Sequence, residues 1–503
     1  MKKIIRWLFI CTQMISIVDV SAENNLREPP LQCNNEWLTN HMEHVLPCYL
    51  IKEEPDSGWT ITQTSSKKVT HKDLSTEVDI IYADLVSLRW QQGEKASVDF
   101  PLWQHRLTIF KPHQLKHNTA LLYINGGIIH TSGELQQINT EPELDFARIA
   151  ARTKSIVIDL KDIPNQFLQF KDTPPLKEDN LIVFTWKQFL NNPQENFNWP
   201  LRLPMVKAAI YGMNASEEIL QRQKIAIKDF VIAGASKRGW TASLTATQDS
   251  RIVALIPQVA DFMNLKEMID HIFNVYPQGN PAISPYLPLK ALFERPEMDQ
   301  LISIVDPYQY KRFLKIPKFF VTASGDHFIP PDTNKVFFDK LPGDKWMRVL
   351  PNQGHYINYD SAHLITDLTE SFYGAFLQGR SLPRVTWEQE GKSLYINTSR
   401  RPKEAWLWQA TNSSGRDFRR VTSNKDLSAY TRTKVKFKCH DRTCNSNLKL
   451  PQDKKGWTAS FIEMHFNNAP FADLVFTTRV FVQPDDYPDK TASGNKKALN
   501  PEE

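Results

Sequence analysis

Residues 225–247 read IAIKDFVIAGASKRGWTASLTAT, and this stretch predicts a strand, a tight turn and a helix. The apolar run FVI is typical of a buried strand, and it ends at Gly234. From Thr241 on, small residues suit a helix packed closely on a sheet. Ser236 stands at the turn, where its hydroxyl would project clear of the backbone. It is therefore a candidate nucleophile; the alternative is a serine that only caps the helix.

The turn departs from the pattern G-x-S-x-G that is typical of nucleophilic serines at such a turn. Gly234 lies two residues before Ser236, but Arg238 stands two residues after it and Gly239 comes one residue late. Because strand and helix backbones crowd together there, Arg238 must point its Cβ outward. A phosphate-binding loop is a weaker match, since Trp240 occupies the place of the lysine that this motif requires.

The length of 503 residues and the hydrophobic content of 41% predict two or three domains with buried cores. Residues 1–22 have a basic start, an apolar core and the sequence VSA before Glu23, which is typical of a cleavable export signal. We therefore expect an exported protein, periplasmic or extracellular, with no stable membrane span after cleavage. Loss of three basic residues and Asp19 lowers the formal net charge from +5 to +3, which argues against a nucleic-acid partner.

Four cysteines follow the export signal, in two closely spaced pairs. In an oxidising compartment we expect two local disulfides, Cys33 with Cys48 and Cys439 with Cys444. A four-thiolate metal site is the competing interpretation, but the chain contains no C-x-x-C pair. It also lacks the H-E-x-x-H motif of zinc enzymes, so we expect neither a metal nor a cofactor.

Strand and helix patterns alternate through the first three quarters of the chain, which predicts a mostly parallel sheet with helices on both faces. Two antiparallel strands are expected first, at 78–90 and 104–110. The further strands are expected at 120–124, 155–160, 251–259, 318–322 and 346–350, and helices at 143–152, 180–190 and 204–221.

An acid and a histidine follow two late strands. Asp326 comes after the strand at 318–322, and His355 comes after the next strand. The chain order Ser, Asp, His is the one that α/β-hydrolases use for their catalytic triad. Asp261, also at a strand end, is the alternative acid.

Backbone amides are the candidate donors to a reaction oxyanion. The amide of Lys237 directly follows the serine, and the sequence NGG at 125–127 allows the backbone to approach a ligand closely. We therefore expect a second donor from Gly127 or Ile128; the alternative is a tight turn that needs a positive φ. Lys237 and Arg238 also suggest a positive potential that would favour an anionic acyl substrate.

The sequence suggests five segments. They are an export signal (1–22), an N-terminal arm (23–66), an α/β-hydrolase domain (67–383) with a cap (263–314), a small antiparallel β-sandwich-like domain (384–484) and a disordered tail (485–503). Apolar cap residues could roof a substrate pocket or form a simple packing layer: Met268, Ile272, Phe273, Tyr276, Tyr286 and Leu287. In TKVKFKC at 433–439, the alternation predicts one strand with its lysines facing outward.

Several phrases together resemble the PhoPQ-activated pathogenicity-related protein family. They are WQHRLTIFKP at 103–112, LLYINGG at 121–127, IPNQ at 163–166, EDNLIVFTWKQF at 178–189, LPMVKA at 203–208, GASKRGWT at 234–241, SGD at 324–326, PNQGHY at 351–356 and TTRVFVQPDDYP at 477–488. The resemblance covers residues 70–488 and implies an α/β-hydrolase domain with a C-terminal β domain, export and a link to bacterial virulence. It also implies that Arg238 belongs to the motif.

These features predict a secreted serine hydrolase that cleaves an ester or amide bond of a small-molecule or peptide acyl substrate. Ser236 would attack, His355 would carry the proton and Asp326 would orient the imidazole. The competing hypothesis is a secreted binding or signalling protein, associated with virulence, on a catalytically idle hydrolase fold.

Overall fold

The computed structural model describes residues 16–17, 25–72, 74–91, 97–129, 144–277, 279–357, 363–420 and 429–488. The expected export signal lies outside the described residues except for a two-residue strand, and so does residue 489 onward of the expected tail. Across the described part of the chain, no helix is both long and apolar enough to cross a membrane.

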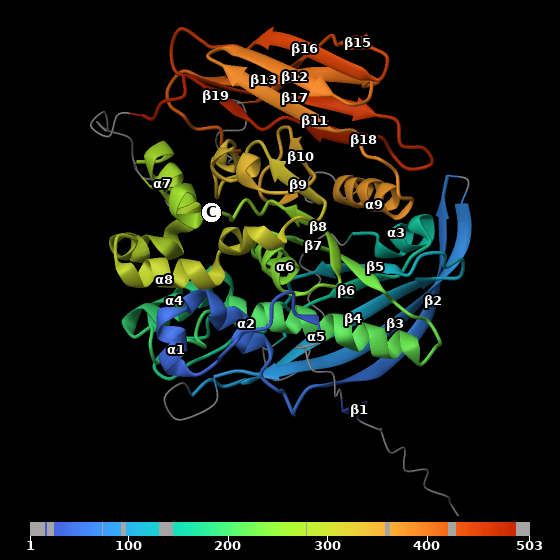
Figure 1. Cartoon of the computed structure of the whole chain (residues 1–503), viewed down its shortest axis with the longest axis vertical. Helices are drawn as coiled ribbons and strands as arrows, with labels where there is room; N and C mark the ends of the chain where they lie inside the picture. The colour runs from blue at the N-terminus through green and yellow to red at the C-terminus, as the bar shows by residue number, and fades with distance from the viewer. Residues whose placement is uncertain are drawn as a thin grey trace, which may run out of the picture.

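A ten-stranded mixed sheet forms the centre of the larger domain (Figure 1). Its strands are β1 (Ser16–Ile17), β2 (Gly58–His71), β3 (Leu74–Arg89), β4 (Leu102–Pro112), β5 (Thr119–Ile124), β6 (Val157–Leu160), β7 (Asp229–Ala235), β8 (Ile252–Gln258), β9 (Lys318–Ala323) and β10 (Lys345–Leu350). They lie in the order β1-β2-β3-β4-β6-β5-β7-β8-β9-β10. Neighbours are antiparallel up to the β4–β6 pair and parallel from β6 to β10. This arrangement confirms the α/β-hydrolase-type fold.

Helices cover both faces of the sheet, and successive strand residues enter two separate cores. Leu122 packs with α5 (Arg202–Gln221) and α6 (Lys237–Gln248) on one face. Leu121 packs with α3 (Phe146–Thr153) and α9 (Leu364–Leu377) on the other. Because strands buried on both faces are apolar at every position, the run at 120–124 could be recognised from sequence.

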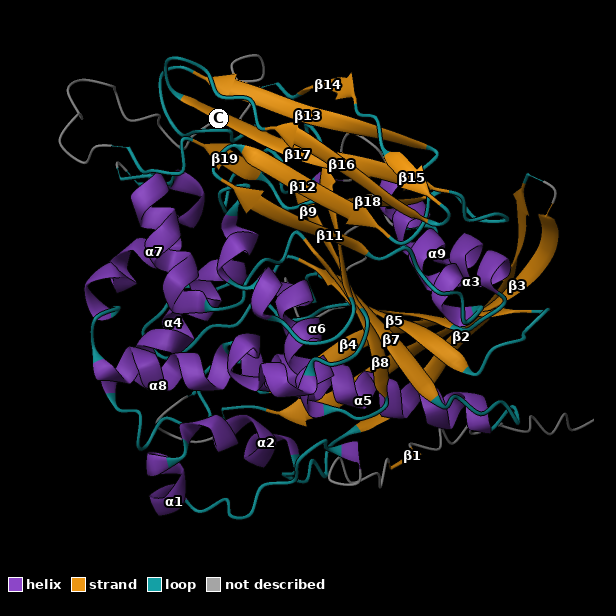
Figure 2. Ribbon diagram, turned by 45° about the horizontal axis from the view of Figure 1, so that its top comes forward, coloured by secondary structure: helices purple, strands orange, loops and turns teal. Residues whose placement is uncertain are grey.

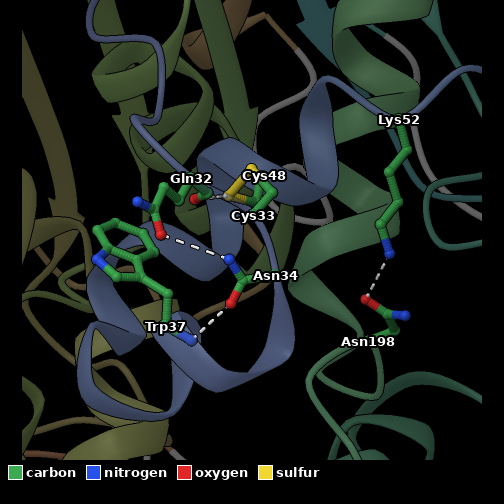
Figure 3. The surroundings of a disulfide bond; sticks show 7 residues. All are labelled: Gln32, Cys33, Asn34, Trp37, Cys48, Lys52 and Asn198. Atoms are coloured by element: carbon green, nitrogen blue, oxygen red, sulfur yellow. Dashed lines mark hydrogen bonds between the residues drawn. A yellow bond between two sulfur atoms is a disulfide. The ribbon is translucent and has the colours of Figure 1, made fainter.

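The segment before the sheet is more ordered than the arm that the sequence suggests. This segment contains helices α1 (Asn35–Asn40) and α2 (Val45–Leu50), and the expected Cys33–Cys48 disulfide links the chain just before α1 to α2 (Figure 3). Every residue of α2 is buried. The boundary expected at residue 66 lies inside β2, because β2 is near the sheet edge and carries exposed polar residues that give no apolar signal.

The cap inserts between β8 and β9. It contains α7 (Leu265–Val275), η3 (Pro281–Leu292), α8 (Pro296–Val305) and η4 (Pro307–Phe313). Helix α4 (Glu178–Asn191) contacts both η3 and α8. The cap therefore lies on the side of the sheet that also carries α4 (Figure 1).

Two antiparallel sheets at the C-terminus pack above β9 and β10 (Figure 2). One contains β11 (Val385–Glu390), β12 (Ser393–Thr398), β15 (Lys438–His440) and β16 (Thr443–Lys449), and the other β13 (Glu404–Asn412), β14 (Thr431–Lys434), β17 (Trp457–Phe466), β18 (Leu474–Thr477) and β19 (Phe481–Gln483). The Cys439–Cys444 disulfide forms as expected. The stretch 433–439 is not one strand, because the chain passes there from β14 in one sheet to β15 in the other.

Candidate active site

The turn between β7 and α6 has the backbone of a strained elbow. Ser236 adopts φ 53° and ψ −127°, a conformation that a residue with a side chain rarely adopts. A Cβ on Gly239 would lie 2.6 Å from both the carbonyl oxygen of Gly234 and the Cβ of Ala260. Gly239 thus provides the close backbone contact, which explains why Arg238 can occupy the position two after the serine.

Ser236, His355 and Asp326 form one hydrogen-bonded chain. The Oγ of Ser236 lies 2.8 Å from His355 Nε2, and His355 Nδ1 lies 2.7 Å from Asp326 Oδ2. The backbone amide of Phe328 donates to Asp326 Oδ1 at 2.7 Å, which holds this carboxylate in place. His355 and Asp326 are 5% and 1% exposed. The ends of β7, β9 and β10 thus bring the three sequence-predicted residues together.

Asp261 follows β8 but has a different partner. Its Oδ2 accepts a hydrogen bond from Thr322 Oγ1 at 3.0 Å. Burial raises the pKa of Asp261 to about 7, and the neighbouring charge of Asp326 adds to this rise. Among the hydrogen bonds of the described residues, it is Asp326 that meets His355. Asp261 is thus a buried acid near Asp326, the residue that contacts His355.

The expected oxyanion donors lie around the elbow. Lys237 is the first residue of α6, so its amide has no acceptor within the helix. The carbonyl of Gly127 accepts from Gln166 Nε2 at 2.8 Å, and a Cβ on Gly127 would meet Asp162 Oδ1 at 2.0 Å. Only glycine fits there. The donor roles of Lys237, Gly127 and Ile128 stay predictions.

Two carboxylates from the first turn of α4 neutralise the cations beside the serine. Glu178 binds Arg238 Nη2 at 2.6 Å and Lys237 Nζ at 2.7 Å, and Asp179 lies 3.1 Å from Lys237 Nζ. Burial opposes the charge of Glu178, but Arg238 and Lys237 outweigh it and hold the pKa of this carboxyl below its usual range. The positive potential that the sequence suggests at Lys237 and Arg238 is therefore compensated.

A pocket of about 740 Å³, including its open mouth, lies over Ser236. Cap residues form much of its wall, together with side chains from α4 and α6. It is lined by Asp179, Trp186, Arg202, Ser236, Lys237, Trp240, Phe262, Leu265, Met268, Ile269, Ile272, Phe273, Ile283, Tyr286, Phe293, Phe328 and Ile329. Four of the six apolar cap residues singled out from the sequence belong to it; Tyr276 and Leu287 do not.

Several residues of the site had no recognisable sequence signal. Glu178 and Asp179 lie almost 60 residues before the cations that they bind. Arg420 precedes β14 and reaches the loops that carry Asp326 and His355, where its backbone amide donates to the carbonyl of Gly325 at 2.8 Å and its guanidinium donates to the carbonyl of Asn352. Arg202 and His327 also lie at the site, and His327 packs edge-on against His355. Only the fold brings these residues together.

Within the described residues, no group of three or more His, Cys, Asp or Glu side chains is arranged to hold a metal ion. All four cysteines after residue 25 are in disulfides.

Comparisons with known proteins add relatives of two kinds. The chain is 28% identical over 430 residues to autocrine proliferation repressor protein A of Dictyostelium discoideum, which covers 80% of this chain and 85% of that protein. Among solved structures, an acetyl xylan esterase of a Paenibacillus species covers 72% of this chain and 98% of its own, with 11% identity and a TM-score of 0.41. Acetyl xylan esterase 1 of a Thermoanaerobacterium species covers 66% and 92%, with 13% identity and a TM-score of 0.39.

The model of one protein family matches residues 46–419, which is most of the chain and includes Ser236, Asp326 and His355. The chain belongs to the PhoPQ-activated pathogenicity-related protein family.

Proposed function

We propose that this protein is an exported serine hydrolase that cleaves an ester or amide bond through Ser236, His355 and Asp326. The observation that carries this proposal is the hydrogen-bonded chain from the serine hydroxyl through the imidazole to a buried carboxylate. The strained backbone of Ser236 and the pocket directly above it support the same function. Two disulfides are consistent with an oxidising compartment outside the cytosol.

In this mechanism Ser236 Oγ attacks the acyl carbon while His355 Nε2 accepts the hydroxyl proton. Asp326 keeps the proton on Nδ1 and stabilises the imidazolium that forms. The amides of Lys237 and of Gly127 or Ile128 hold the oxyanion of the tetrahedral intermediate. The imidazolium then gives its proton to the leaving group, and a water molecule that His355 activates hydrolyses the acyl-enzyme.

A second candidate is a binding or signalling protein on an idle hydrolase fold. The relative from Dictyostelium discoideum favours it, because its name describes a repressor of proliferation rather than an enzyme. Both functions are compatible with the same fold.

Labelling with a fluorophosphonate probe separates the two. We expect the wild-type protein to be labelled and Ser236→Ala to be unlabelled, since the probe bonds to an activated serine hydroxyl. Ser243→Ala is the matched control, because Ser243 lies on the same helix, α6, and its hydroxyl donates to the carbonyl of Gly239. If the folded wild type is not labelled, or if Ser236→Ala is still labelled, the hydrolase proposal is wrong.

A further inference from the structure

Arg202 is a buried cation on the wall of the pocket above Ser236. It is the first residue of α5, and its side chain is 1% exposed. Its guanidinium stacks on the indole ring of Trp240, with 4.1 Å between the guanidinium carbon and the ring centroid. Nη1 donates to the carbonyl of Lys237 at 2.8 Å. Arg202 therefore lies next to the elbow that carries the nucleophile.

The charges around the pocket do not balance without a ligand. Lys237 and Arg238 share the carboxylates of Glu178 and Asp179, whereas Arg202 takes part in none of the ion pairs of the described residues. Asp179 also accepts a hydrogen bond from Tyr286 at 3.2 Å. The charges of Asp179 and Glu178 attract Arg202 through space, but neither carboxylate forms an ion pair with its guanidinium. Three cations thus face two carboxylates, and the surplus positive charge resides on Arg202.

The guanidinium also has unused donor capacity. Nη1 has its carbonyl partner and longer contacts of 3.4 Å to Thr241 Oγ1 and to Met205 Sδ, but Nε has no hydrogen-bond partner among the described residues. Burial lowers the pKa of Arg202 to about 10, so the side chain keeps its charge at neutral pH. A buried charge without an ion-pair partner is costly, and a ligand that supplies one gains what the free protein lacks.

A carboxylate fits this position best. The planar fork of a guanidinium matches the two oxygens of a carboxylate, and a low dielectric strengthens the bond between them. Apart from Asp179, Ser236 and Lys237, the rest of the wall is aromatic and aliphatic, as Trp186, Phe262 and Phe273 illustrate. Such a wall favours an apolar chain between the reacting carbonyl and the charged end.

We propose that the pocket binds an acyl group with an apolar body and a carboxylate, and that Arg202 is the residue that recognises this carboxylate. This inference rests on the proposed hydrolase function. It assigns the preference for an anionic acyl group to a residue other than Lys237 and Arg238, whose charges are compensated.

The test compares 4-nitrophenyl hexanoate with the mono-4-nitrophenyl ester of adipic acid, which replaces the terminal methyl group with a carboxylate. Suberate and octanoate esters form a longer matched pair. We expect the wild-type protein to have the higher kcat/KM for the carboxylate ester, after subtraction of spontaneous hydrolysis. Arg202→Met should lower that value roughly 30-fold or more while it changes the neutral ester's value much less. Arg202→Lys should restore part of the preference.

Arg222→Met is the matched control, because Arg222 stacks on Trp59 in a similar way but does not line the pocket. If Arg202→Met slows both esters equally, Arg202 only supports the elbow and the proposal is wrong. If Arg202→Met does not fold, the wild type still decides, since monomethyl adipate and monomethyl suberate must then protect Ser236 from the fluorophosphonate better than the neutral methyl hexanoate and methyl octanoate do. Equal protection overturns the inference, whereas a wild type without any labelling overturns the hydrolase function instead.

Discussion

Substitution of the two buried acids near His355 tests which of them orients the histidine. In Asp326→Asn, the amide nitrogen would donate to His355 Nδ1, where the carboxylate accepts at 2.7 Å in the wild type. The imidazole would then carry its proton on Nε2, the atom that lies 2.8 Å from Ser236 Oγ. It could no longer accept the serine proton. We expect kcat to fall about 10⁴-fold, which corresponds to about 5.5 kcal/mol in the activation free energy.

Asp261→Asn should act differently. The asparagine oxygen can still accept from Thr322, and the pKa of about 7 means that Asp261 is largely uncharged below neutral pH. We therefore expect kcat at pH 6 to change by less than about threefold, or under 1 kcal/mol. The rate at which each variant hydrolyses a 4-nitrophenyl ester measures its kcat. The fraction of wild-type protein that the fluorophosphonate labels gives the concentration of active sites for normalisation. The reasoning is refuted if Asp261→Asn loses the activity and Asp326→Asn keeps it.

The raised pKa of Asp261 also predicts how the stability of the folded protein changes with pH. The folded protein binds the Asp261 proton more tightly than the unfolded chain does, so this residue makes the wild type less stable as the pH rises from about 4 to about 7. The total loss from this group is at most about 4 kcal/mol. Asp261→Asn should remove this loss. Urea unfolding at pH 5 and pH 8 would then show a smaller drop in the free energy of unfolding for the variant than for the wild type.

Two further predictions concern stability. Burial opposes the charge of Glu463, but His465 and Arg348 lower its pKa to about 2. Glu463→Gln should therefore lower the free energy of unfolding by about 3 kcal/mol at pH 7. The exposed Glu390→Gln is the control. Urea unfolding should show the difference shrinking as the pH falls from about 4.5 to about 2, and a constant difference would contradict it. Gly239→Ala should lower the free energy of unfolding by about 3 kcal/mol or more, because its Cβ would lie 2.6 Å from a backbone oxygen. Gly415→Ala is the control, since a Cβ on Gly415 meets nothing within 4 Å. An unchanged melting temperature for Gly239→Ala relative to Gly415→Ala would refute this.

Local sequence signals predicted much of the fold and the three central site residues. Strand β5 could be found because burial on both faces makes it apolar throughout. Ser236, Asp326 and His355 could be found because each follows a strand, and parallel strands end at the same edge of the sheet. Both disulfides could be paired because their cysteines are close in sequence.

Other features were missed for physical reasons. Strand β2 is exposed over most of its length, so its polar sequence resembles that of a loop. The pairing of Arg238 with Glu178 joins residues from two different helices, and no local pattern encodes it. Arg202 lies just before the helix expected at 204–221, and no local pattern distinguishes an arginine on a pocket wall from any other arginine.

The elbow motif GASKRGWT connects the proposed nucleophile with the proposed substrate site. Gly239 provides the backbone contact that the strained Ser236 requires, which leaves Arg238 free to bind Glu178 on α4. One residue after Gly239, Trp240 forms part of the pocket wall and stacks on Arg202. The same short segment thus positions the proposed nucleophile, binds the helix whose carboxylates neutralise its cations and stacks on Arg202, the cation that we propose for the ligand. A change in this motif should therefore alter substrate preference together with rate.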